Sequence, residues 1–103
     1  MNLSTNNLVI LRGNLGQDPD IKSGGCVELR LCTTQGRGDK EVREWHTIKA
    51  FGQLGDLCAK FLKKGRGVGI VGRLTYFETE PEKTVDGSKR KYAEIVADQV
   101  DFL

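Results

Sequence analysis

The chain has 103 residues, enough for one compact domain and too few for two. Its hydrophobic and charged fractions, 38% and 29%, are ordinary for a globular protein, and a net charge of +2 gives only a weak overall field. No apolar run is long enough to span a bilayer, and the first apolar run is too short and has no basic start of the kind that a signal peptide carries, so we expect a cytoplasmic protein whose residues 1–103 form a single domain.

The first half of the chain indicates three strands. Leu8–Asn14 is apolar and rich in β-formers, and it ends at a turn that contains glycine. In Cys26–Thr34 apolar and polar side chains alternate, which predicts a half-buried strand. The polar stretch Gln35–Arg43 predicts the loop of a hairpin, and Trp45–Phe51 then predicts the third strand.

The second half indicates one helix and two more strands. Apolar residues recur at helical spacing, which predicts a short amphipathic helix with an apolar face made of Leu54, Leu57, Cys58, Phe61 and Leu62. Val68–Tyr76 and Lys91–Val100 predict the fourth and fifth strands, joined by a polar loop over Phe77–Lys89.

This order of elements is typical of one small fold. Five strands with a helix between the third and fourth suit a Greek-key barrel of the oligonucleotide/oligosaccharide-binding type, the OB-fold, with the helix covering one end. A small open α+β sheet remains the alternative, because element order alone does not show that the barrel closes.

No pattern of catalytic or metal-binding residues stands out. His46 is the only histidine and has no obvious nucleophile or ligand beside it, while Cys26, Cys32 and Cys58 match no CxxC pattern. Gly67–Gly72 fits GxGxxG, but it follows a predicted helix and lies within a predicted strand, so close backbone approach explains it better than a dinucleotide site. We therefore predict a protein that is not an enzyme, binds no cofactor or metal, and keeps reduced thiols as small hydrophobic side chains.

The third predicted strand carries an unusual row of side chains. Trp45, Thr47, Lys49 and Phe51 share one face, opposite a face that includes Ile48. A lysine inside a core is costly unless it is paired, so the row is expected to face solvent. Exposed rings with a cation between them suit unpaired bases, which stack on aromatics while their phosphates meet the ammonium group. A protein–protein interface built on the same rings is the alternative.

Several segments together resemble bacterial single-stranded DNA-binding proteins. They are Asn7–Pro19, Glu44–Ile48 with Phe51–Gly52, Ala59–Gly65, Val71–Leu74 and Tyr92–Asp98. The resemblance covers nearly the whole chain. It implies the five-stranded barrel, binding of single-stranded DNA without sequence specificity, base stacking on Trp45 and Phe51, and usually a homotetramer, with a dimer left open.

The row of side chains and the resemblance together define the predicted site. Trp45 and Phe51 stack bases, and Phe77 adds a third platform. The cations expected to contact phosphates are Lys49, Arg37, Arg43, Arg73, Lys89 and Arg90. The residues expected at the oligomer interface are Leu8, Ile10 and His46, of which His46 matches a family histidine near that interface.

The sequence departs from the family in three places. Members often carry a tryptophan where this chain has Gln35–Gly38, and another where Thr79 stands, with Tyr76 and Phe77 nearby as substitutes. Fewer rings predict weaker binding or a smaller footprint. The family's flexible tail, whose acidic, hydrophobic tip recruits repair and replication enzymes, does not occur within these 103 residues. Either a tailless member of the family or a shortened chain fits this, and we do not expect residues 1–103 to recruit partners through such a tail.

The expected role is protection of single-stranded DNA in replication, recombination or repair, at the bacterial nucleoid in the cytoplasm. The alternative is a replication accessory or primosomal module, in which the same barrel binds another protein and the rings face that partner.

Overall fold

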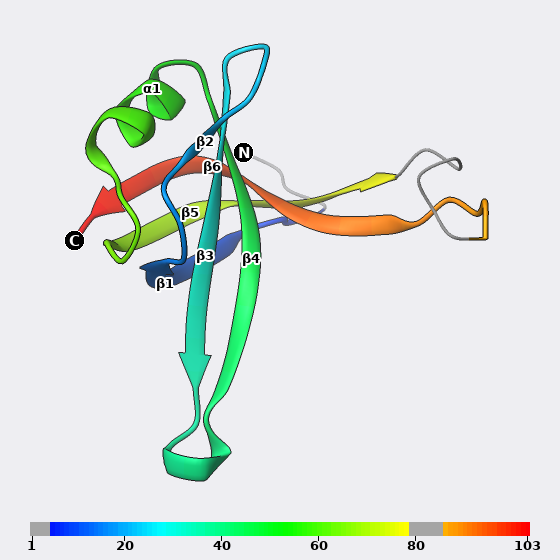
Figure 1. Cartoon of the computed structure of the whole chain (residues 1–103). Helices are drawn as coiled ribbons and strands as arrows, with labels where there is room; N and C mark the ends of the chain where they lie inside the picture. Colours follow the sequence, from blue (N-terminus) through cyan, green and yellow to red (C-terminus); the bar gives the residue numbers. More distant parts are fainter. Residues whose placement is uncertain (1–4, 79–85) are drawn as a thin grey trace.

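The computed structural model describes residues 5–78 and 86–103, which form a closed barrel of five long strands with one helix (Figure 1). The elements in chain order are β1 (Val9–Leu15), the two-residue β2 (Asp20–Ile21), β3 (Cys26–Gln35), β4 (Val42–Phe51), α1 (Gly52–Phe61), β5 (Gly67–Glu78) and β6 (Lys91–Phe102), with a 3-10 turn, η1 (Gly38–Lys40), between β3 and β4.

The pairing of the strands shows that the barrel closes. Neighbours follow the order β1-β5-β6-β4-β3, and β1 also pairs with β3 through Asn14–Cys32 and Leu15–Leu31. All pairs of long strands are antiparallel except β4 and β6, which run parallel at Ile48–Ile95 and Lys49–Val96. The OB-fold prediction is therefore confirmed, and the open sheet is excluded.

The core follows from the alternation of side chains along the strands. In β3 every second residue from Val27 to Leu31 is buried, and in β4 Ile48 and Ala50 are fully buried. The residues that complete the interior are Leu15, Val68, Ile70, Ile95, Ala97, Cys58 and Leu62. Because one face of each strand is committed to this core, the register fixes which side chains face outward.

The helix α1 covers one end of the barrel, as predicted, but with a narrower apolar face. Cys58 and Leu62 are buried, whereas Leu57 and Phe61 are 41% and 50% exposed. A Cβ on the buried Gly55 would lie 2.7 Å from the carbonyl oxygen of Ala50. The helix therefore approaches the barrel closely along one line of small and apolar residues. Leu57 and Phe61, which were predicted to belong to its apolar face, remain exposed to solvent.

The glycine-rich run at the start of β5 lies within a strand. A Cβ on Gly72 would overlap the carbonyl oxygen of Val96 on β6. The β5–β6 register shifts at this point, since Val71 pairs with Gln99 and Gly72 with Ala97. Close backbone approach at a bulge thus explains the glycine, as expected for this run.

Two long hairpins leave the barrel in different directions (Figure 1). The β3–β4 pairing continues to Gln35–Val42, so the connecting loop is shorter than the predicted Gln35–Arg43. The β5–β6 pairing continues to Glu78–Lys91, so β5 includes Phe77, which was predicted to lie in a loop. In both hairpins the strands extend beyond their alternating apolar residues, because the outer parts of the hairpins do not cover the core. Within the described residues, no helix is long and apolar enough to cross a membrane.

Candidate nucleic-acid interface

The outer face of β4 carries the row of side chains that the sequence indicated. Cross-strand pairing sets Trp45 opposite Cys32 and Phe51 opposite Cys26 on β3, with Thr47 between them opposite Arg30. Trp45 is 48% exposed and Phe51 49%, whereas Ile48 and Ala50 between them on the inner face are fully buried. The prediction that both rings point outward is confirmed.

The Trp45 indole rests on a glycine. A Cβ added to Gly16, just after β1, would overlap Cζ3 of Trp45 and lie 2.6 Å from its Cη2. The Gly16 amide donates to the carbonyl oxygen of Arg30, which holds the turn against β3. The absence of a side chain at position 16 therefore leaves room for the indole, and this contact could not be predicted from the sequence.

A second pair of rings lies on the β5–β6 hairpin. Phe77 and Tyr92 face each other across the two strands, with ring centroids 5.5 Å apart and planes inclined by 28°. They are 41% and 44% exposed. Phe77 was predicted as a platform, whereas Tyr92 was missed, because its position opposite Phe77 depends on the register of the hairpin.

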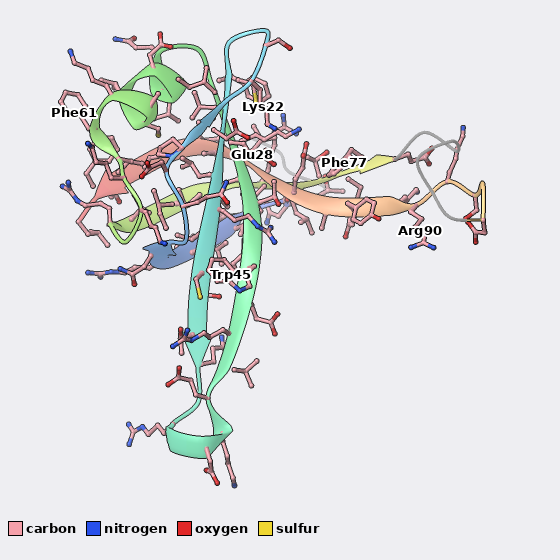
Figure 2. All side chains as sticks on the ribbon, viewed as in Figure 1. Lys22, Glu28, Trp45, Phe61, Phe77 and Arg90 are labelled. Carbon is pink, nitrogen blue, oxygen red and sulfur yellow. The ribbon has the colours of Figure 1, made fainter. Side chains whose placement is uncertain are left out.

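Trp45, Phe77 and Tyr92 line one groove, whereas Phe51 is not part of its lining. The groove holds about 330 Å³ and lies between the diverging hairpins, with Trp45 on the β4 side and Phe77 and Tyr92 on the other. Figure 2 shows Trp45 on one hairpin and Phe77 on the other. Arg30 and Thr47 contribute polar groups to the lining, and the guanidinium Nη1 of Arg30 donates to Oγ1 of Thr47 at 2.8 Å.

Lys49 occupies the outer face as predicted, but its charge is paired. Its Nζ lies 3.1 Å from Oε2 of Glu94, a side chain only 10% exposed, and Lys49 itself is 28% exposed. The same Nζ lies 5.4 Å from the centroid of the Phe77 ring. The contact with Glu94 was not predicted, because β4 and β6 are far apart along the chain.

The other predicted cations lie mainly toward the ends of the hairpins. Arg37 and Arg43 are at the tip of β3–β4, where Arg43 Nε lies 3.4 Å from Oε1 of Glu41. Lys89 and Arg90 precede β6, and Arg73 is exposed in the middle of β5. Because exposed ion pairs are weak, a phosphate can displace such partners at little cost.

The residues predicted for an oligomer interface are in two places. Leu8 and Ile10, at and just before the start of β1, are 68% and 69% exposed. His46 is half-buried, and its Nε2 lies 2.8 Å from Oγ1 of Thr33 on the neighbouring strand. Leu8, just before β1, and Ile10, within β1, are thus available to a partner. Among residues 5–78 and 86–103 no group of side chains is arranged to hold a metal ion.

Comparison with known proteins identifies the family. The model described as "Single-strand binding protein family" matches residues 6–103. The chain belongs to this family. Membership confirms the prediction of a binding protein in place of an enzyme.

Relatives in the single-strand binding protein family cover nearly all of this chain. The single-stranded DNA-binding protein of Xylella fastidiosa is 42% identical over 106 residues, which cover 94% of this chain and 63% of that protein. Single-stranded DNA-binding protein 1 of Chlorobaculum tepidum is 41% identical, with 94% and 64% covered. The chain therefore spans less than two thirds of the length of these relatives.

A solved structure shows the same fold. The Plasmodium falciparum SSB in complex with ssDNA superposes with a TM-score of 0.82 at 28% sequence identity, covering 100% of this chain and 99% of that one. The barrel, its helix and its hairpins are thus those of a single-strand binding protein.

Proposed function

We propose that this chain binds single-stranded DNA without sequence preference, by stacking bases on its exposed rings and contacting phosphates with its cations. The observation that carries the proposal is the groove in which Trp45 lies opposite the stacked Phe77 and Tyr92. Every unpaired base offers a π-face to such rings, whereas bases in a duplex are already stacked on each other. The names of the relatives and the ssDNA in the solved complex support the same ligand.

The rings suggest a path for the strand along β4. Phe51 follows Trp45 by six positions on the same face, which corresponds to about 20 Å of extended strand. The cations proposed to contact phosphate along and beside this path are Arg37, Arg43, Arg73, Lys89 and Arg90. Lys49 differs from them because its ammonium group is already paired with Glu94.

We further infer that the protein acts as a homo-oligomer that protects single-stranded DNA in replication, recombination or repair. Leu8 and Ile10 support the assembly, because neighbouring exposed aliphatic side chains gain free energy when a second subunit covers them. His46 remains a candidate for the same interface.

A direct binding experiment tests the ligand. A labelled oligothymidylate and a duplex of the same length are titrated with the protein over a series of salt concentrations. The single strand should bind more tightly at each concentration, and log affinity should fall against log salt by about 0.7 for each phosphate neutralised. Equal affinity for both forms, or no binding to the single strand, would contradict the proposal.

A further inference from the structure

The ion pair between Lys49 and Glu94 is largely shielded from solvent. Glu94 is 9% exposed, and a carboxylate so deeply buried is costly unless a cation compensates it. Its Oε2 has no hydrogen-bond partner within the described part of the chain, and the Lys49 ammonium at 3.1 Å supplies its charge compensation. Moving Lys49 away to meet a phosphate would leave that carboxylate buried and unpaired.

The same ammonium group reaches the ring platform. Nζ of Lys49 lies 5.4 Å from the Phe77 centroid, and Phe77 stacks on Tyr92 at 5.5 Å. A cation at this distance is attracted by the ring quadrupole and favours one placement of the ring. Glu94 pairs with Lys49, Lys49 lies near the Phe77 ring, and Phe77 stacks on Tyr92. These four side chains form one continuous chain of contacts.

This chain of contacts joins the two hairpins where their backbones separate. β4 and β6 pair at only two positions, Ile48–Ile95 and Lys49–Val96, and the ring platform lies beyond them on β5 and β6. Beyond these two positions the platform has no backbone pairing with β4. A side-chain contact is therefore needed to fix the position of the platform relative to Trp45 across the groove. Lys49 provides that contact.

We propose that Lys49 and Glu94 are positioning residues for the Phe77–Tyr92 platform, and that Lys49 does not contact phosphate. The inference rests on the proposed function, because it assigns a role within the same binding groove. It replaces the expectation from sequence that Lys49 is one of the phosphate-binding cations, and the two roles differ in a measurable way.

Salt dependence separates the two roles. A phosphate contact releases counterions, so its loss should reduce the log–log slope by about 0.7, whereas loss of a cation that contacts no phosphate should leave the slope unchanged. Lys49→Met should therefore weaken oligothymidylate binding by about three- to tenfold at every salt concentration with the slope of the wild type. Arg73→Met is the matched control, because Arg73 is exposed and has no ion pair in the described part of the chain; its slope should fall by about 0.7.

Glu94→Gln gives the opposite signal. This substitution frees the Lys49 ammonium to meet a phosphate, so the slope should steepen by about 0.7. Lys49→Met leaves Glu94 buried without a cation, so the double variant Lys49→Met/Glu94→Gln is measured as well. It should also bind more weakly with the slope of the wild type. Lys49→Arg should restore the wild-type affinity, because a guanidinium also pairs with a carboxylate and lies over a ring.

A double-mutant cycle shows whether Lys49 acts through Phe77. Phe77→Leu removes the ring, and Lys49→Met should then cost no further affinity in that background. A reduced slope in Lys49→Met, or the same loss of affinity with and without Phe77, would overturn the positioning role while leaving single-strand binding intact. Absence of single-strand binding by the wild-type protein would overturn both proposals.

Discussion

Replacing Trp45 with alanine should weaken binding of single-stranded DNA while leaving the fold nearly as stable. The indole is 48% exposed and rests on Gly16, outside the core, so its removal opens no internal cavity. If one base stacks on the indole, its loss costs about 1–3 kcal/mol, or about 5- to 150-fold in affinity.

Ile48 provides the matched control on the same strand. It lies three positions further along β4 on the opposite face and is 0% exposed. Ile48→Ala should lower the free energy of unfolding by about 2–5 kcal/mol, since it leaves a cavity in the barrel. The folded fraction of that variant should bind the oligonucleotide as the wild type does.

Two assays measure the contrast between these variants. Urea unfolding followed by far-UV circular dichroism gives stability without depending on the tryptophan. Anisotropy of a labelled oligothymidylate at fixed salt gives affinity. A folded Trp45→Ala protein that binds as tightly as the wild type would refute the reasoning, and so would a greater loss of stability for Trp45→Ala than for Ile48→Ala.

Three further predictions concern a contact, a thiol and an interface. Gly16→Ala should displace the indole and weaken oligothymidylate binding, yet change nothing in a Trp45→Ala background; equal losses in both backgrounds would show that the indole is not involved. Burial raises the pKa of the Cys58 thiol from 9.0 to about 11, so the folded state holds this proton more tightly than the unfolded state and stability should fall as pH rises between these values. The free energy of unfolding is measured by urea unfolding at both ends of this pH interval, for the wild type and for Cys58→Ala. The substitution should remove at most about 3 kcal/mol of the fall in stability, and an identical fall in both proteins would show that the Cys58 thiol does not cause it. Ile10→Glu should convert the oligomer to monomers in sedimentation velocity with an unchanged circular dichroism spectrum, while an unchanged assembly would exclude this surface.

Local alternation was sufficient to predict which face of β4 is exposed. Side chains in a strand alternate with a period of two, so assigning Ile48 to the core assigns Trp45 and Phe51 to the outside without any knowledge of the neighbouring strands. The order of elements likewise predicted the barrel, because few small folds place one helix between the third and fourth of five strands.

Contacts between distant strands could not be read from the sequence. Tyr92 meets Phe77 only through the register of the β5–β6 hairpin, and Glu94 meets Lys49 only through the parallel pairing of β4 and β6. The helix shows a related limit, since the spacing of Leu57 and Phe61 places them on its apolar side without showing how much of that side the barrel covers.

The intrinsic fluorescence of Trp45 tests the central claim most directly. Trp45 is the only tryptophan of the chain, so its emission reports on one ring of the proposed groove. Addition of oligothymidylate should quench the emission with a saturable curve, and duplex of the same length should have little effect. Emission that stays constant while a labelled oligothymidylate demonstrably binds would show that bases do not stack on this ring, and the proposed mode of binding would be wrong.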